Sequence, residues 1–362
     1  MNSFALYRMP HDEQCTLIEQ TAGEPEPLDS IADLDGCSGF VVAPFVSTNE
    51  CPLLVIRPDS VSVLAQNAIH FGPKHTPFWP KTHSVLAQNG NSASDNRQAY
   101  AADFNCFHSH LLSGEFRKLV LARSADVPLN HQPDPFMLFR QACMLYPRLF
   151  IALVYTPQSG LWLTATPEIL LDSSDGHNWR TIALAGTMRL SDDDLDGEGQ
   201  HMSWSTKNIE EQRVVATYIA QCLQRFSNDV AEQGPRTVRA ANLVHLRSDF
   251  TFTLYNNNAR VGELLQQLHP TPAVCGLPKD DALRFITRNE HTARRYYSGF
   301  MGPFNMSNHS THLYVSLRCM QLFADHCTLY AGGGLLRESN EEQEWVETEA
   351  KMLTMRNLII TE

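Results

Sequence analysis

The sequence predicts an α/β fold in which strands and helices alternate along the chain. Short apolar runs are separated by Pro, Asp, Ser and Gly, as is typical of strands joined by tight turns. Helical patterns fall near residues 205–225, 281–297 and 341–357. With 362 residues, 43 % of them hydrophobic, the chain can bury a large core. We therefore expect a single domain over residues 1–362, although the length alone also allows two.

The composition excludes several classes of protein. The formal net charge is −12 and no basic run offsets it, so we expect no nucleic-acid partner. The chain shows no basic segment leading into an apolar one, and no run of about 18 apolar residues. We therefore expect a cytoplasmic protein without a membrane partner. The nine cysteines are scattered and form no CxxC pair, which indicates reduced thiols and neither zinc nor disulfides.

The N-terminal part, residues 1–96, is weakly patterned and contains no catalytic constellation. Its apolar runs, such as residues 40–45 and 53–56, predict strands. The polar stretch 81–97 predicts an exposed loop that marks a junction within one body. Residues 101–112 then predict a helix.

The segment FRKLVLARSADV predicts a strand that is led by Lys118. A lysine in such a place usually lies at the strand end with its amine in water. The alternative is a lysine held between apolar walls, which loses part of its preference for charge and can act as a base. The pattern leaves both readings open.

Glu168 follows Pro167 in the segment GLWLTATPEILLD, just ahead of three apolar residues. A partly buried carboxylate at this place would have a raised pKa and would keep a proton to donate. The alternative is a turn glutamate in water.

The predicted helix over 205–225 places Glu211 inside an apolar stripe with Val215, Tyr218, Ile219 and Cys222. An ionised carboxylate in that position needs a partner, which is either a cation or a metal. The acidic stretch 191–199 before the helix does not match the spacing of a calcium loop, so we expect a solvated loop there.

The C-terminal stretch 329–355 predicts a strand, a run of glycines at 332–334, an acidic loop and a helix. Glu344, Glu347 and Lys351 share one face of that helix because their spacing is i, i+3, i+7. The opposite face is apolar and consists of Val346, Ala350 and Leu353. Consecutive glycines let a ligand approach backbone N–H groups, although neither nucleotide-loop pattern is present. The plainer alternative is a solvated face with an i, i+4 ion pair.

Together these segments resemble the motifs of the chorismate-utilising enzymes, which include isochorismate, salicylate, anthranilate and aminodeoxychorismate synthases. LYAGGGLL followed by EWVETEAK is similar to the family's AGAGIV and EWxETxxK signature. KLVLAR, TPEILL, ALAGTMRL, STKNIEEQRVV and HPTPAVCGLP are similar to the family's KVVLSR, TPELLL, PLAGSARR, SxKDxxEHxxVV and HPTPALSGFP. The resemblance covers residues 97–358 in the family's order. It implies one α/β body with two stacked, mostly antiparallel sheets, helices outside and the site in a cleft.

The resemblance also implies roles for five acidic and basic residues. Lys118 would be the base that activates a water, and Glu168 the acid that protonates the leaving hydroxyl. The ammonia-using members lack this lysine, which argues against anthranilate synthase. Glu211 and Glu347 would bind Mg²⁺, while Glu344 would hold a metal-bound water.

Two positions depart from the family's motif, since Asn208 stands for Asp and Gln212 for His. Both changes leave the carboxylate of Glu211 in place and bear only on the tuning of the metal site.

Several residues would contact the substrate by the same resemblance. They are Gly186, Thr187, His245, Ala273, Arg318, Tyr330, Gly332 and Lys351. A guanidinium suits bidentate binding of a carboxylate, and Arg318 would take the enolpyruvyl carboxylate. His245 can equally be a structural histidine. Glu290 and Arg294 are expected to form an i, i+4 helical pair that braces the site.

The expected function is therefore a Mg²⁺-dependent isochorismate synthase that feeds menaquinone or siderophore biosynthesis. Water would add at C2 of chorismate while the C4 hydroxyl leaves. The alternatives are a salicylate synthase, which expels pyruvate in the same pocket, and a non-catalytic chorismate-binding protein. Ala273 followed by Val274 is typical of isochorismate synthases, where salicylate synthases tend to carry a threonine. We expect chorismate as the small-molecule partner and a monomer or weak dimer.

Overall fold

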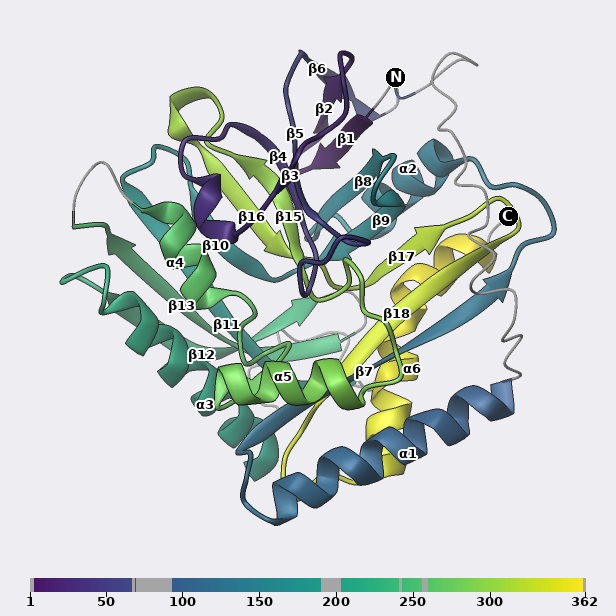
Figure 1. Cartoon of the computed structure of the whole chain (residues 1–362), viewed down its shortest axis with the longest axis vertical. Helices are drawn as coiled ribbons and strands as arrows, with labels where there is room; N and C mark the ends of the chain where they lie inside the picture. The colour runs from purple at the N-terminus through teal and green to yellow at the C-terminus, as the bar shows by residue number, and fades with distance from the viewer. Residues whose placement is uncertain are drawn as a thin grey trace.

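The computed structural model describes residues 3–66, 69, 93–189, 203–240, 243–255 and 260–360. Within these residues the chain forms two nine-stranded sheets (Figure 1). All of the strand pairs are antiparallel, and helices cover the outer faces of the sheets. The predicted α/β fold with two stacked antiparallel sheets is therefore confirmed.

The first sheet contains both the first strand of the chain, β1 (Ser3–Arg8), and the last, β18 (His326–Leu335). In spatial order it consists of β14 (Gly276–Leu277), β7 (Lys118–Pro128), β18 (His326–Leu335), β17 (Cys319–Leu322), β9 (Gly160–Thr166), β8 (Phe150–Thr156), β1 (Ser3–Arg8), β2 (Gln14–Gln20) and β6 (Ser60–Ala65). The glycines of the C-terminal motif lie in β18 and pair with β7, so that Gly334 is opposite Val120. This pairing places the glycines beside the strand that begins with Lys118.

The second sheet is built in the same way. In spatial order it consists of β12 (Ala231–Ala240), β13 (Leu243–Thr253), β11 (Asn178–Arg189), β10 (Ile169–Ser173), β16 (Thr311–Val315), β15 (Phe300–Phe304), β4 (Gly39–Ala43), β5 (Leu53–Ile56) and β3 (Pro27–Leu28). The register of β11 on β13 shifts between Ala185 and Thr187, with Gly186 as the extra residue at a φ of +69°.

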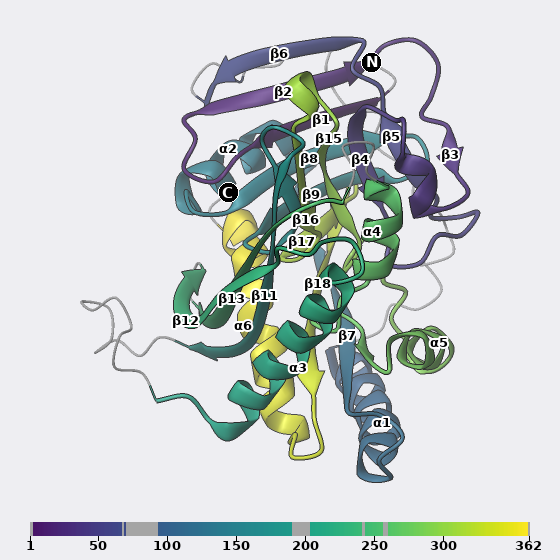
Figure 2. The ribbon, with the colours of Figure 1, turned by 90° about the vertical axis from the view of Figure 1, so that its left-hand side faces the viewer.

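The N-terminal residues contribute to both sheets. β1, β2 and β6 extend the first sheet, whereas β3, β4 and β5 extend the second. Both views show β1, β2 and β6 at the end of the molecule opposite α1 (Ala93–Leu112) (Figure 2). The apolar runs 40–45 and 53–56 thus form strands, as predicted. The expected loop over 81–97 lies mostly outside the described residues, and Ala93 to Arg97 belong to α1.

Besides a cluster that packs α1 and α5 (Lys279–Asn289) against the first sheet, three apolar layers hold the sheets and helices together. One lies between the two sheets and includes Phe40, Trp162 and Tyr314. The second packs α2 (Pro135–Leu145) and α6 (Glu341–Ile360) against the first sheet. The third packs α3 (Thr206–Leu223) and α4 (Val261–Leu268) against the second sheet. Central strands such as β8 and β9 are therefore buried on both faces, whereas the edge strands β6 and β12 are largely exposed or half-buried.

Capping residues start the two helices that bear the acidic site residues. Ser205 accepts a hydrogen bond from the Asn208 backbone N–H at the start of α3. The Asn340 side chain accepts one from Gln343 N at the start of α6. The first turn of α6 also carries Glu341, Glu342 and Glu344, whose charge suits a helix N-terminus. None of the helices that the structure describes is long and apolar enough to span a bilayer.

Two details of the helices differ from the expectation. α5 (Lys279–Asn289) ends before Glu290, so Glu290 and Arg294 are not a helical pair. Glu290 and Arg294 still form an ion pair at 2.6 Å. The guanidinium of Arg294 also donates to the carbonyls of Val120 and Val274, which holds it in place. On α6, Val346 is 40 % exposed, so the expected apolar face was wrong at that residue. The acidic stretch 191–199 lies outside the described residues.

Candidate active site

Most of the residues predicted from the sequence line one cavity between the two sheets. From that prediction the lining includes Glu168, Gly186, Thr187, Glu211, His245, Ala273, Arg318, Tyr330, Gly332 and Lys351. They come from β10 and its preceding turn, β11, β13, β18, α3, α6 and two loops. Lys118, Glu344 and Glu347 are absent from this lining. Lys118 and Glu347 form ion pairs with lining residues, namely Glu211 and Lys351, whereas Glu344 forms one with Lys207.

Lys118 is fully buried at the start of β7. Its amine lies 2.9 Å from Oε1 of Glu211, whose side chain is 12 % exposed. Gly334 makes room for both groups. A Cβ at that position would lie 2.0 Å from Glu211 Oε1 and 3.0 Å from Lys118 Cε. The reading of Lys118 as a solvated strand-end residue therefore does not hold.

Glu168 lies in the turn between β9 and β10 and is 3 % exposed. Burial raises the pKa of its carboxyl to about 8, although the cations of Lys118, Lys351 and Arg318 lower it. The backbone of the residue is fixed, because its carbonyl accepts a hydrogen bond from Val315 N at 2.9 Å. A carboxyl with this pKa is protonated at neutral pH and can donate a proton.

Three carboxylates gather around the glycines of β18, and each of them faces a lysine. Glu211 pairs with Lys118, Glu344 with Lys207 and Glu347 with Lys351. A Cβ on Gly333 would lie 3.1 Å from Glu344 Oε2, while Gly334 abuts Glu211. Both carboxylates thus point at the same short stretch of β18.

The two buried carboxylates differ in their affinity for protons. Burial raises the pKa of Glu211, but the nearby Lys118, Lys207 and Lys351 outweigh it, so the net pKa is lowered. Burial and the neighbouring Glu347 hold the pKa of Glu344 above its usual value despite Lys207. Glu344 is 1 % exposed, and its Oε2 has no hydrogen-bond partner.

The donor set fits a hard divalent cation. In the part of the chain that the structure describes, no three His, Cys, Asp or Glu side chains converge closely enough to hold an ion by themselves. Mg²⁺, however, usually binds through one or two carboxylates together with waters and substrate oxygens. The unpartnered Oε2 of Glu344 is a buried acceptor that can bind a hydrogen-bond donor or a cation. Glu211 and Glu347 are therefore suitable ligands by their chemistry, and Glu344 is suited to hold a metal-bound water.

Arg318 supplies a buried positive charge on the opposite side of the lining. It has a φ of +47°, in the left-handed region that a residue with a side chain rarely adopts. Burial lowers its pKa to about 10, so the guanidinium stays charged at neutral pH. Its Nη2 lies 2.9 Å from His245 Nε2, whereas its Nη1 has no partner. That free N–H group is available to a carboxylate.

His245 orients this arginine. Burial and then the charges of Arg318 and Lys351 keep the pKa of His245 well below its usual value, so the ring is neutral. Because Nε2 accepts from Arg318, the ring proton resides on Nδ1, which lies 3.3 Å from Thr187 Oγ1. His245 thus connects the arginine to the bulge at Gly186 and Thr187.

The remaining predicted contacts shape the cavity. Lys351 Nζ donates to the carbonyl of Gly332 at 2.8 Å and pairs with Glu347 at 2.7 Å. Tyr330 is stacked between Tyr297 and Trp162, with ring centroids 5.7 Å and 5.4 Å away. These stacked rings lie beside the cavity, and Tyr297 and Tyr330 belong to its lining.

The reasoning from sequence missed Lys207, and it named Gln212 only as a departure from the family's motif without its contacts. Lys207 pairs with Glu344, and Gln212 is buried against β11 and β13. The signal for Lys207 was present, because it precedes Glu211 by one helical turn on the same face. Gln212 had no such signal, since its backbone partners come from strands far away in the sequence.

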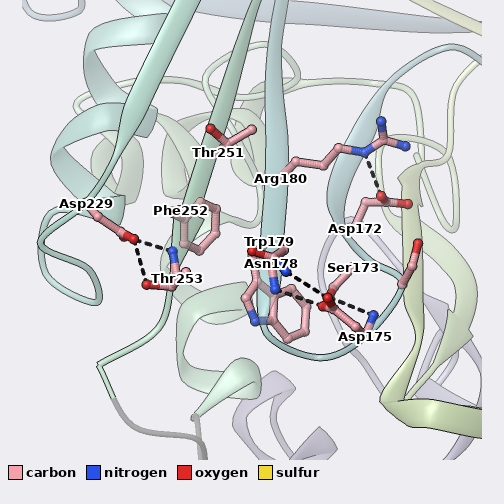
Figure 3. Close-up of a pocket in the computed structure, with 11 residues that line it drawn as sticks. Asp172, Ser173, Asp175, Asn178, Trp179, Arg180, Asp229, Thr251, Phe252 and Thr253 are labelled. Atoms are coloured by element: carbon pink, nitrogen blue, oxygen red, sulfur yellow. Dashed lines mark hydrogen bonds and ion pairs between the residues drawn. The ribbon is translucent and has the colours of Figure 1, made fainter.

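A larger cavity of about 510 Å³ lies at the turn between β10 and β11 (Figure 3). Its carboxylates already have partners. Asp172 binds Arg180 and His312, Asp175 accepts from backbone N–H groups of its own turn, and Asp229 binds Thr253. It contains none of the predicted site residues, and none of its described lining residues has a buried side-chain N or O atom without a hydrogen-bond partner.

Comparison with known proteins gives a consistent result. The family model described as chorismate binding enzyme matches residues 65–360. Isochorismate synthase MenF of Escherichia coli (strain K12) is 32 % identical over 251 residues, or 69 % of this chain and 57 % of that protein. Isochorismate synthase EntC of the same organism is 30 % identical over 244 residues, or 67 % of this chain and 62 % of that protein. The chain thus spans only 57–62 % of the length of these relatives.

A solved structure extends the likeness to the whole fold. DhbC from Bacillus anthracis aligns with a TM-score of 0.80 and 23 % sequence identity, covering 100 % of this chain and 97 % of that one. At this identity the likeness establishes the architecture, including the N-terminal strands that the sequence motifs do not reach.

Proposed function

Because this chain belongs to the family of chorismate binding enzymes, we propose that it is an isochorismate synthase that converts chorismate to isochorismate with Mg²⁺. The proposal assigns the acid to Glu168, the base to Lys118 and the metal ligands to Glu211 and Glu347. Glu344 would hold a metal-bound water. Isochorismate would serve menaquinone or siderophore biosynthesis, as the names of related proteins suggest.

One observation carries the proposal: a buried lysine and a protonated buried glutamate belong to the same site. Lys118 is fully buried, and burial raises the pKa of Glu168 to about 8. The two groups sense each other electrostatically, since the charge of Lys118 lowers the pKa of Glu168. Acid and base chemistry at neutral pH needs such a pair in different environments.

The proposed reaction adds one water and releases one. Lys118 accepts a proton from a water as its oxygen bonds to C2 of the ring. The ring double bonds shift, the C4–oxygen bond breaks, and Glu168 gives its proton to the departing hydroxyl. The product therefore has the same composition as the substrate. For Lys118 to accept the proton, its amine must first be neutral and free of Glu211.

The remaining residues would bind and orient chorismate. The free Nη1 of Arg318 is suited to the enolpyruvyl carboxylate, with His245 holding the guanidinium in place. Gly186, Thr187, Ala273, Tyr330, Gly332 and Lys351 would contact the rest of the substrate. Mg²⁺, when bound by Glu211 and Glu347, would neutralise the ring carboxylate, which the acidic cluster otherwise repels.

The test is incubation of the purified protein with chorismate, with and without Mg²⁺, followed by liquid chromatography with mass detection. Isochorismate formed only with Mg²⁺ supports the proposal. Salicylate with pyruvate would identify a salicylate synthase instead. Binding of chorismate without any product would identify a non-catalytic binding protein.

We also propose that the chain acts in the cytoplasm as a monomer or weak dimer, without nucleic-acid or membrane partners. All nine cysteines are free thiols, as a reducing compartment allows. Size-exclusion chromatography with light scattering measures the assembly state, and a stable tetramer or larger particle would contradict this part of the proposal.

A further inference from the structure

One lysine of the acidic cluster has no part in the reaction proposed above. We propose that Lys207 is a built-in cation that neutralises Glu344 in the metal-free protein, and that a divalent cation must displace it in order to bind. The inference rests on the proposed function, because it takes Glu344 and the neighbouring Glu211 and Glu347 as the surroundings of the metal.

The contact joins two helices that cover different sheets. Lys207 is the second residue of α3, and its amine forms an ion pair with Glu344 Oε1 in the first turn of α6. Glu211 and Glu347 also lie near enough to act on this amine electrostatically. It is therefore under the influence of all three carboxylates, as a metal ion in the same place would be.

The lysine does not satisfy the carboxylate that it faces. Oε1 of Glu344 is paired with the amine, whereas Oε2 is buried and has no hydrogen-bond partner in standard geometry. The nearby Ser339 hydroxyl also acts on this carboxylate and lowers its pKa. A buried acceptor of this kind is costly and is normally paired in a native protein. The second oxygen therefore marks a place for another positive group or for a water that it holds.

The three lysines of the cluster are not equally free to leave. The Lys118 side chain is 0 % exposed, and that of Lys351 is 17 % exposed and also bonded to the Gly332 carbonyl. The Lys207 side chain is 25 % exposed and makes a single ion pair. Its amine can move into water without breaking a second contact, because a lysine stem can reach solvent while its base stays packed.

A divalent cation near Oε2 of Glu344 would lie close to the amine on Oε1, and like charges repel strongly in a partly desolvated site. Binding of the ion therefore releases Lys207 to solvent. The affinity for the ion is in turn weakened by the ion pair that has to be broken.

Chemical labelling of lysines tests the displacement without any substrate. The protein is treated with an acetylating reagent in the absence and presence of saturating Mg²⁺, and the labelled sites are quantified by mass spectrometry. We expect the labelling of Lys207 to rise several-fold with Mg²⁺. Lys279 is the internal control, because its amine is bonded to the carbonyls of Gln266 and Gln267 away from the cluster. Unchanged labelling of Lys207 would overturn the inference.

Titration of Mg²⁺ by calorimetry tests the competition. We expect Lys207→Gln to bind Mg²⁺ more tightly than the wild type, by roughly tenfold for the loss of one partly buried ion pair. Arg213→Gln is the matched control, because it removes one positive charge from an exposed position on the same helix. Equal or weaker binding by Lys207→Gln, or no Mg²⁺ binding by the wild type, would contradict the proposal.

These outcomes are separate from those that test the function. Protein that binds Mg²⁺ and releases Lys207, yet leaves chorismate unchanged, would support this inference and refute isochorismate synthesis. Conversion of chorismate to isochorismate, with an unchanged Mg²⁺ affinity in Lys207→Gln, would support isochorismate synthesis and refute this inference.

Discussion

The two carboxylates near Lys118 are both buried, but their pKa values shift in opposite directions. Glu168 has cations nearby but no ion pair of its own, so burial raises its pKa to about 8. Glu211 is in contact with the amine of Lys118, so its net pKa is lowered and it stays ionised. One carboxyl is thus a proton donor and the other an anion, although both lie within the same site.

The protonated state of Glu168 predicts the pH dependence of turnover. Activity should fall as pH rises through about 8, because the acid then loses its proton. Glu168→Gln should reduce kcat by about 10²- to 10⁴-fold with little change in KM. Steady-state rates of isochorismate formation from pH 6 to 10 check both expectations. Wild-type turnover in a folded Glu168→Gln protein would rule out this role.

The same shift has a consequence for stability. Because the folded pKa of Glu168 is raised, the protonated carboxyl contributes stability that is full below the unfolded pKa and is lost as pH rises through about 8. Glu168→Gln should therefore unfold at higher urea concentration than the wild type at pH 9. At pH 4 the two proteins should be alike.

Gly334 predicts a graded effect of a single methyl group. A Cβ at Gly334 would lie 2.0 Å from the Glu211 carboxylate, whereas one at Gly333 would meet only Glu344 Oε2 at 3.1 Å. Gly334→Ala should therefore lower turnover by at least about 100-fold, as displaced catalytic groups do. Gly333→Ala should have the smaller effect. Equal turnover of the wild type and Gly334→Ala would show that this close approach is unimportant.

Sequence reasoning located Lys118 and Glu168 because each interrupts an apolar run. It could not find the pairing of Lys207 with Glu344, because the two residues are far apart in sequence and meet only when α3 and α6 are in place. The assignment of roles came from the family resemblance and stays a prediction.

At the scale of elements, α3 anchors the strand that carries Gly186 and Thr187. The buried side chain of Gln212 accepts from Ala185 N at 2.9 Å and donates to the Ala183 carbonyl at 3.1 Å. It also lies 3.3 Å from Ser248 Oγ on β13. The residue that departs from the family's histidine thus bonds to the strand and makes no contact with a carboxylate in this structure.

Gln212→Leu should loosen this strand, because it leaves a buried backbone N–H and carbonyl without partners. We expect a loss of about 1–3 kcal/mol in the free energy of unfolding and a raised KM for chorismate. Urea denaturation and steady-state kinetics measure the two effects. Gln221→Leu, at an exposed position of the same helix, is the control and should change neither. Identical stability and KM of the two variants would show that Gln212 does not hold this strand in place.

The periodic pattern found the long helices, and it failed where a contact outside the helix decides the conformation. α5 stops before Glu290, since its carboxylate is drawn to Ala122 N at 2.7 Å and to Arg294. On α6, the pattern could not tell which face is buried, because Glu344 and Thr348 lie inward while Val346 points to solvent.

At the scale of the whole molecule, the N-terminal residues are inseparable from the two sheets. β1 pairs with β8, and β4 pairs with β15, so the N-terminal strands continue both sheets at one end. The sequence showed that these segments are strands, but it could not divide them between the sheets. Strand pairing depends on contacts between residues that are distant in the chain.

This arrangement predicts one cooperative unfolding transition for the whole chain, as for a single domain. Tryptophan fluorescence and far-UV circular dichroism should give coincident urea curves. Two separate transitions would indicate that the N-terminal part folds as an independent unit.

The central claim is that water, activated by Lys118, adds to the ring as the C4 hydroxyl departs. The most direct test is turnover of chorismate in H₂¹⁸O with Mg²⁺, with mass analysis of the product. We predict isochorismate that carries one ¹⁸O in its ring hydroxyl, and none formed by Lys118→Ala protein that is shown to be folded. Unlabelled isochorismate, or labelled product formed equally well without Lys118, would contradict the account.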